Sequence, residues 1–176
     1  GLDNTIEKGV IHRDIRENFT RLYNANLPII HYWRPFVPQN SSNERLLEIL
    51  TYVSKYAKAS VIAGLKIENS YKSKLTFWEE LMDLDGAEEA EGVYPDNVLP
   101  FFRELPDEFL HYPIYQSNSC ALAYVLGQAD RNAFYGSEIC EFNNCPKNQR
   151  GLCGEFFNLN LPTQFKVDKL LKNINK

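Results

Sequence analysis

Four cysteines lie in the last third of the 176-residue chain, and thiolates are the side chains that soft metals prefer. Cys140, Cys145 and Cys153 follow one another with four and seven residues between them, and Cys120 lies further upstream. Short spacings on a segment with glycine, asparagine and proline let thiolates converge on one metal. We therefore expect a tetrahedral zinc site or a 4Fe-4S cluster. The spacing differs from the Cys-x2-Cys pairs of common zinc modules, so the choice of metal stays open.

Two other arrangements of the thiols are open from the sequence. Disulfides are rare in cytoplasmic proteins, and ordinary buried cysteines are common singly but rarely gather as these do. Cys120 lies in the apolar run SNSCALAYVLG, residues 117–127. Its position suits a core residue as well as a fourth metal ligand.

Other residue patterns with chemical meaning are sparse. His12, His31 and His111 are far apart and lack the spacing of a histidine metal site, and no Walker, GxGxxG or GxSxG motif occurs. Arg34 follows directly after a predicted buried strand. Since parallel sheets bind ligands at the carboxyl ends of their strands, Arg34 is a candidate for ligand binding, with a salt bridge to a nearby loop as the alternative.

The elements that could position such residues follow from the apolar pattern. Apolar residues at helical spacing predict a helix over 14–26, and continuous apolar runs predict buried strands over 27–33 and 59–65. Between the strands, a capping box of Ser41 and Glu44 predicts the start of a helix over 44–57. Strands joined by a crossover helix belong to parallel sheets, so residues 1–68 are expected to form an α/β segment.

The rest of the chain divides into two further segments. Residues 69–115 hold a short predicted helix over 75–84, an acidic stretch over 79–91, and a proline- and aromatic-rich part expected to wrap the core irregularly. The acidic stretch is interpreted as a solvated excursion, with a lid or partner-binding loop as the alternative. Residues 116–176 contain the cysteines and end in a predicted docking helix over 162–176.

Composition limits the classes of function. Hydrophobic residues make up 44% of the chain and charged residues 24%, which predicts a folded domain. No apolar stretch is long enough for a membrane span and the opening residues are too polar for a secretory signal, so we expect a soluble cytoplasmic protein. The net charge of -4 does not favour nucleic acid as a partner.

Several phrases of the chain, taken in order, resemble the second half of a radical S-adenosylmethionine (SAM) enzyme. These are GLDN at 1–4, the phrase at 25–28, the loop from Arg34 to Asn40, and Ala63 to Leu65. The cysteine-containing tail resembles the C-terminal extensions of the group that includes spore photoproduct lyase-like and other DNA-photoproduct lyase-like proteins. The resemblance covers about the first 70 residues and, more loosely, the tail.

The resemblance implies a fold and a set of roles. The fold would be an open partial (β/α) barrel, the C-terminal half of a radical SAM-type barrel, with an irregular cysteine-rich C-terminal extension. The cofactors would be SAM and a 4Fe-4S cluster, with an auxiliary 4Fe-4S cluster or zinc at Cys120, Cys140, Cys145 and Cys153. The SAM-side residues would be Asp3 and Asn4 near the ribose, Ala63, Gly64 and Leu65 against the adenine, and Arg34 and Asn40 facing substrate or the SAM carboxylate.

The Cys-x3-Cys-x2-Cys loop that defines this family is absent from the chain. We expect it, and the segment that holds the methionyl amine, in an N-terminal half supplied by the same longer protein or by a second chain. The chain alone is then expected to be inactive. Two alternatives are a zinc-stabilised binding module without catalysis and a structural α/β domain with free thiols.

Overall fold

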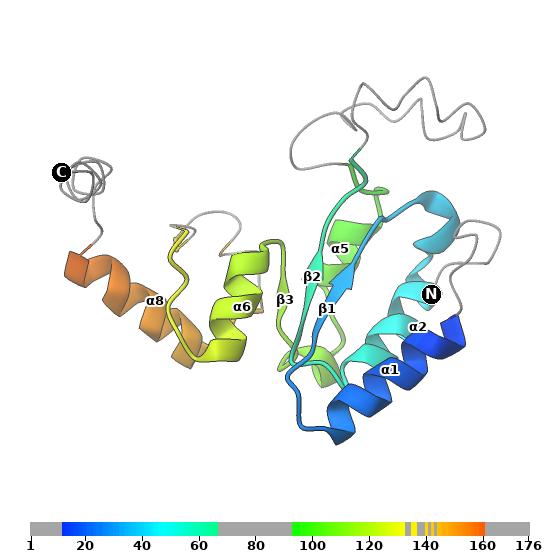
Figure 1. The fold of residues 1–176 in the computed structure, drawn as a ribbon. Helices are drawn as coiled ribbons and strands as arrows, with labels where there is room; N and C mark the ends of the chain where they lie inside the picture. The colour runs from blue at the N-terminus through cyan, green and yellow to red at the C-terminus, as the bar shows by residue number, and fades with distance from the viewer. Residues whose placement is uncertain are drawn as a thin grey trace, which may run out of the picture.

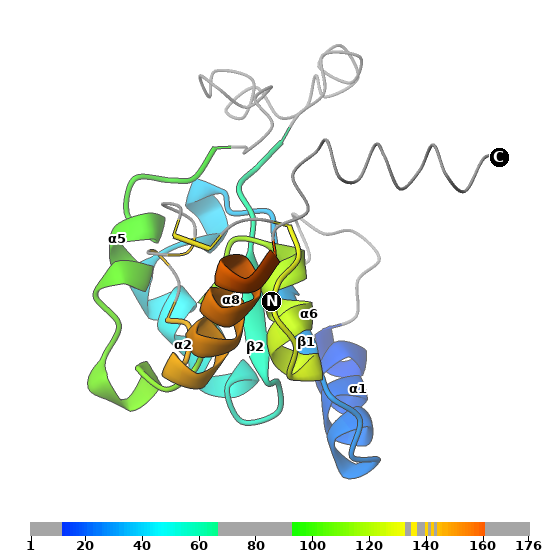
Figure 2. The same ribbon diagram turned by 90° about the vertical axis from the view of Figure 1, so that its left-hand side faces the viewer.

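The computed structural model describes residues 12–66, 93–132, 135–136, 140, 142 and 144–160. Within them, three parallel strands form an open sheet in the order β1-β2-β3 (Figure 1). Helices lie on both sides of this sheet (Figure 2), so the chain is of the α/β class. Asp3, Asn4, the predicted helices over 75–84 and 162–176 and the acidic stretch over 79–91 lie outside the described residues.

The first helix and strand follow the apolar pattern closely. Helix α1 spans His12–Asn24, and strand β1 spans Ile30–Trp33. The strand begins three residues later than predicted because the helix ends in a left-handed turn at Asn26, where φ is 55°. The N–H of Leu27 closes this turn on the carbonyl of Leu22, and the Leu27 side chain is left largely exposed.

The predicted strand–helix–strand unit is confirmed. Helix α2 spans Asn43–Val53, and strand β2, Ala59–Ile62, pairs with β1 in parallel from Ile30 opposite Ala59 to Trp33 opposite Ile62. The predicted cap was one residue off. Ser42, not Ser41, caps α2 by accepting the N–H of Arg45, whereas Ser41 is buried and donates to Asn40.

The stretch after residue 93 is more regular than predicted. It contains helix α5, Val98–Arg103, and a 3-10 turn, η2, at Asp107–Phe109, before strand β3, Ile114–Tyr115, pairs in parallel with β2. A second 3-10 turn, η1 at Pro38–Asn40, precedes α2. Pro100 lies in the first turn of α5, where its missing N–H breaks no helical hydrogen bond, so proline did not prevent a helix here.

Two apolar clusters hold the sheet between its helices. On one face, Trp33 and Ile62 pack with residues of α2 and α5, among them Leu50 and Phe102. On the other face, Val61 and Tyr115 pack against helix α6, Asn118–Leu126. The last described helix, α8 (Lys147–Asn160), lies beyond α6 (Figure 1). No helix in the described parts of the chain is both long and apolar enough to cross a membrane.

Candidate metal centre

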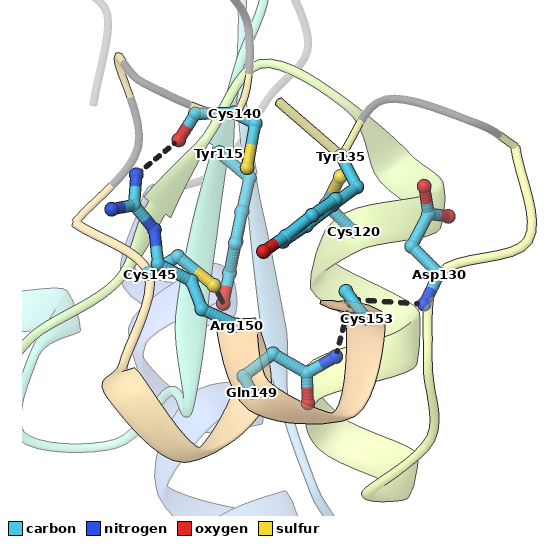
Figure 3. Close-up of a pocket in the computed structure, with 9 residues that line it drawn as sticks. All are labelled: Tyr115, Cys120, Asp130, Tyr135, Cys140, Cys145, Gln149, Arg150 and Cys153. Carbon is cyan, nitrogen blue, oxygen red and sulfur yellow. Dashed lines mark hydrogen bonds between the residues drawn. The ribbon is translucent and has the colours of Figure 1, made fainter. Parts of the chain in front are cut away.

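All four cysteines line one small cavity (Figure 3). Helix α6 contributes Cys120 and helix α8 contributes Cys153, while Cys140 and Cys145 come from the chain between these helices. The cysteines are free thiols, and the cavity has a volume of about 20 Å³. The structure therefore brings the four thiols to one cavity, and their binding of a common metal stays a prediction. Five further residues complete the lining: Tyr115, Asp130, Tyr135, Gln149 and Arg150.

Helix α8 presents two of these lining residues on the same side. Gln149 and Cys153 are four residues apart, which places their side chains one above the other on a helix. Helix α8 begins at Lys147, directly after Cys145 and Pro146. Proline suits this position because the first N–H groups of a helix have no partner within the helix. The start of α8 therefore holds Cys145 close to the side chains of its first turns.

The sulfur of Cys153 accepts two N–H groups. The backbone N–H of Asp130 donates to this Sγ at 3.3 Å, and Nε2 of Gln149 lies 3.5 Å from it. Nε2 of Gln149 also donates to the carbonyl oxygen of Gln128 at 2.6 Å, which fixes the amide in place. N–H groups directed at sulfur stabilise negative charge on it, as they do around metal-bound thiolates.

Burial favours the protonated form of two of the thiols, Cys120 and Cys145, by raising their pKa. It raises the pKa of Cys120 to about 12, with the nearby Asp130 carboxylate as a second cause. It also raises the pKa of Cys145, although the Tyr115 hydroxyl donates to this sulfur at 3.7 Å and opposes the effect. Since metals bind the thiolate form, metal binding here would release protons.

Asp130 adds a second feature that favours a cation. Its side chain is 5% exposed, and Oδ2 is buried with no hydrogen-bond partner in the structure. An unpaired buried carboxylate oxygen is costly, and a positively charged group in the neighbouring cavity would offset that cost. Arg150 also lines the cavity, but its Nη2 donates to the carbonyl oxygen of Cys140 at 2.8 Å.

Tyr135 lies among the cysteine side chains, with its hydroxyl directed into the cavity (Figure 3). Its ring is 41% exposed and packs against Phe157 with ring centroids 5.4 Å apart. On the α8 side, Gly154 leaves space for the ring: a Cβ atom there would approach the Tyr135 hydroxyl to 2.9 Å. A group larger than a water molecule could enter the cavity once this exposed ring turns outward.

The arrangement of the thiols bears on the kind of metal. A single zinc ion needs each sulfur about 2.3 Å from one point. Within the described residues, no three cysteine, histidine or carboxylate side chains are grouped closely enough to hold one ion. The thiols surround the cavity from separate sides instead (Figure 3).

Of the described residues assigned to SAM by resemblance, Arg34 follows the carboxyl end of β1, and Ala63, Gly64 and Leu65 follow that of β2. Ala63 donates its N–H to the carbonyl of Trp33 at 3.2 Å, and Gly64 follows it. Leu65 pairs with Val93 through two backbone hydrogen bonds, of 2.7 and 2.9 Å. These segments lie at the end of the sheet where parallel sheets bind ligands, and their role in SAM binding stays a prediction.

Arg34 and Asn40 differ in how free their side chains are. Nη1 of Arg34 donates to the hydroxyl of Tyr32 at 3.3 Å, and the guanidinium lies over the Tyr32 ring. The amide of Asn40 accepts from Val37 N–H and Ser41 Oγ and donates to the carbonyl of Pro35. Asn40 therefore holds its own loop together and has one amide N–H left for a ligand.

A buried polar chain, which sequence reasoning missed, crosses the sheet. Nδ1 of His31 lies 3.0 Å from Oγ of Ser60, which lies 2.9 Å from the hydroxyl of Tyr112. Burial lowers the pKa of His31 to about 4, so the imidazole is neutral at pH 7. Ser60 is fully buried, which excludes attack on a substrate and gives this chain a structural role.

Tyr115, Asp130 and Gln149 were also missed, and only Gln149 carried a signal, its four-residue spacing from Cys153. Comparison of the chain with protein-family models, with curated proteins and with solved structures finds no match. The site therefore has to be interpreted from its own chemistry.

Proposed function

We propose that the four cysteines bind an iron–sulfur cluster of the 4Fe-4S type, and that the chain is the C-terminal portion of a radical SAM-type enzyme in which this cluster is auxiliary. The observation that carries the proposal is the single cavity lined by Cys120, Cys140, Cys145 and Cys153.

The separation of the thiols favours a cluster over a single zinc ion, and the cavity of about 20 Å³ would have to widen to hold it. In a 4Fe-4S cluster each cysteine binds a different iron, so the sulfurs stand further apart than around one ion. The described thiols are spread around the cavity and form no group suited to one ion. The two N–H groups at Cys153 favour a negatively charged, thiolate-bound group there.

The chain's own residues have defined tasks in this proposal. The N–H of Asp130 and Nε2 of Gln149 would stabilise negative charge on the Cys153 sulfur by hydrogen bonding. The Tyr115 hydroxyl would do so for the Cys145 sulfur. Such hydrogen bonds raise the reduction potential of a cluster, because they favour its more negative state. Tyr135 limits access of water. Bound there, the cluster would supply one-electron transfer.

The wider assignment rests on the sequence resemblance and on the parallel β1-α2-β2 unit that it predicts. A closed barrel of this kind needs about eight strands, so a barrel would require strands from further polypeptide. The radical cluster and most of the SAM contacts would come from that polypeptide. This chain would contribute the auxiliary cluster, the ends of β1 and β2, and part of the substrate cavity.

Anaerobic reconstitution with iron and sulfide tests the cluster. Wild-type protein should turn brown with broad visible absorption, and Cys120→Ser should lose most of that absorption. Leu122→Ala is the matched control, because Leu122 lies on the same helix with its side chain exposed. Zinc uptake without colour would favour a zinc-stabilised binding module instead.

A separate assay tests the enzyme assignment. With SAM and dithionite, this chain alone should form no 5'-deoxyadenosine, because it lacks the Cys-x3-Cys-x2-Cys loop. A longer protein that includes an N-terminal half with that loop should form it. Product formation by this chain alone would contradict the proposed division of roles.

A further inference from the structure

We propose that the edge of β1 left unpaired by the described strands binds an extended polypeptide strand, from a part of the enzyme outside this sequence, that runs parallel to β1 and carries an acidic residue near its carboxyl end. This inference rests on the proposed function, in that the strand comes from further polypeptide of the same enzyme, but it does not depend on the cysteine centre. It rests on the shape of a groove beside β1, on the topology of α1 and on the partners of Arg34.

The groove runs along a strand edge rather than over a sheet face. Its volume is about 540 Å³, and every residue from Ile29 to Pro35 lines it. Successive residues of a strand point to opposite faces of a sheet, so a groove that touches all of them follows the backbone edge. In the sheet order β1-β2-β3, no described strand pairs with this edge. An unpaired strand edge is a template for another strand.

Helix α1 forms one wall of the groove with an apolar face that is incompletely covered. Ile15 and Leu22 line the groove and are 43% and 41% exposed, whereas Phe19 packs on the core. A strand added beside β1 would place alternate side chains against this face. Its apolar residues would therefore bury surface that α1 now leaves open.

Topology gives the direction of the added strand. Helix α1 packs beside α2, because Tyr52 donates to the carbonyl of Arg16 at 3.0 Å and meets Phe19 edge-on. Crossover connections between parallel strands are almost always right-handed. With α1 and α2 on one face, a strand that enters α1 lies on the side of β1 away from β2, parallel to β1.

Arg34 gives the chemistry at the carboxyl end of the groove. Of the arginines that line it, Arg16 and Arg45 pair with Glu48. None of the ion pairs among the described residues includes Arg34, whose guanidinium bonds to the Tyr32 hydroxyl and lies over the Tyr32 ring. A carboxylate on the added strand would form an ion pair with the Arg34 guanidinium, which is an alternative to the contact with SAM or substrate that the resemblance implies.

A fluorescent peptide of alternating valine and threonine that ends in aspartate tests the proposal by anisotropy. We expect saturable binding, slowed hydrogen exchange at Ile30–Trp33, and at least tenfold weaker binding when the central residue is proline. Arg34→Glu should weaken binding of the peptide that ends in aspartate and strengthen binding of a peptide that ends in lysine. Arg21→Glu should change neither, because Arg21 lies on α1 outside the groove.

Three results would overturn the proposal. One is no binding at millimolar peptide, and another is binding that Arg34→Glu leaves unchanged. The third is a dimer in sedimentation with protected β1 amides, which would assign the edge to a second copy of the chain. Iron content is measured on the same preparations, so failure here is distinct from failure of the cluster proposal.

Discussion

Gly154 lies directly against the ring of Tyr135, so closely that a Cβ atom at position 154 would come within 2.9 Å of the hydroxyl and 3.2 Å of Cζ. We predict that Gly154→Ala displaces this ring from the cysteine cavity. The thiols of the metal-free protein should then react severalfold faster with Ellman's reagent.

Gly151→Ala is the matched control. Gly151 lies on the same helix, and a Cβ atom added there would have no neighbour within 4 Å, so alanine should only stabilise α8, by about 0.5–1 kcal/mol. Equal thiol reactivity in the two variants would show that Tyr135 does not cover the cavity.

Cys153→Ala should destabilise the metal-free protein by about 1–3 kcal/mol, because the buried N–H of Asp130 loses its acceptor. Cys153→Ser keeps an acceptor and should cost less, yet it should impair cluster binding as strongly as alanine does. Urea unfolding of the metal-free variants and iron uptake separate the two roles. Equal stability of both variants would contradict the structural role of the hydrogen bond.

His31 should make stability depend on pH. Its pKa is about 4 in the folded protein and about 6.5 when unfolded, so the unfolded chain binds a proton first as the pH falls. The free energy of unfolding should therefore decrease by up to about 3 kcal/mol between pH 7 and pH 4 through this residue.

His31→Gln should remove that part of the pH dependence in urea unfolding curves, since glutamine can still bond to Ser60 but does not titrate in this range. His111→Gln, at an exposed position, is the control. A parallel loss of pH dependence in both variants would rule out His31 as the cause.

The sequence predicted the β1-α2-β2 unit because its signals are local. Two apolar runs flank a helix whose Leu46, Leu50 and Val53 repeat at helical spacing, and all three are buried as expected. The three-residue spacing from Ser41 to Glu44 predicts the cap at Ser41, although Ser42 also precedes the apolar run. Only tertiary structure distinguishes them: Asn97 donates to the Ser41 carbonyl at 2.6 Å and helps to bury that residue.

The elements around the cysteines were missed for physical reasons. Strand β3 has two residues, Ile114 and Tyr115, too few for an alternating pattern, and it forms because β2 offers a free edge. Helix α8 contains Gly151 and Gly154, which lower helix propensity, and packing around the cavity compensates for that loss. The gathering of the cysteines was predictable from spacing, but the donors to their sulfurs come from distant segments.

Iron and acid-labile sulfide counted per chain after anaerobic reconstitution test the central claim most directly. The account predicts about four of each per wild-type chain, and far less for Cys140→Ser, whose thiol lines the same cavity. One zinc per chain with no bound iron, or full iron content in Cys140→Ser, would contradict a cluster held by these four cysteines.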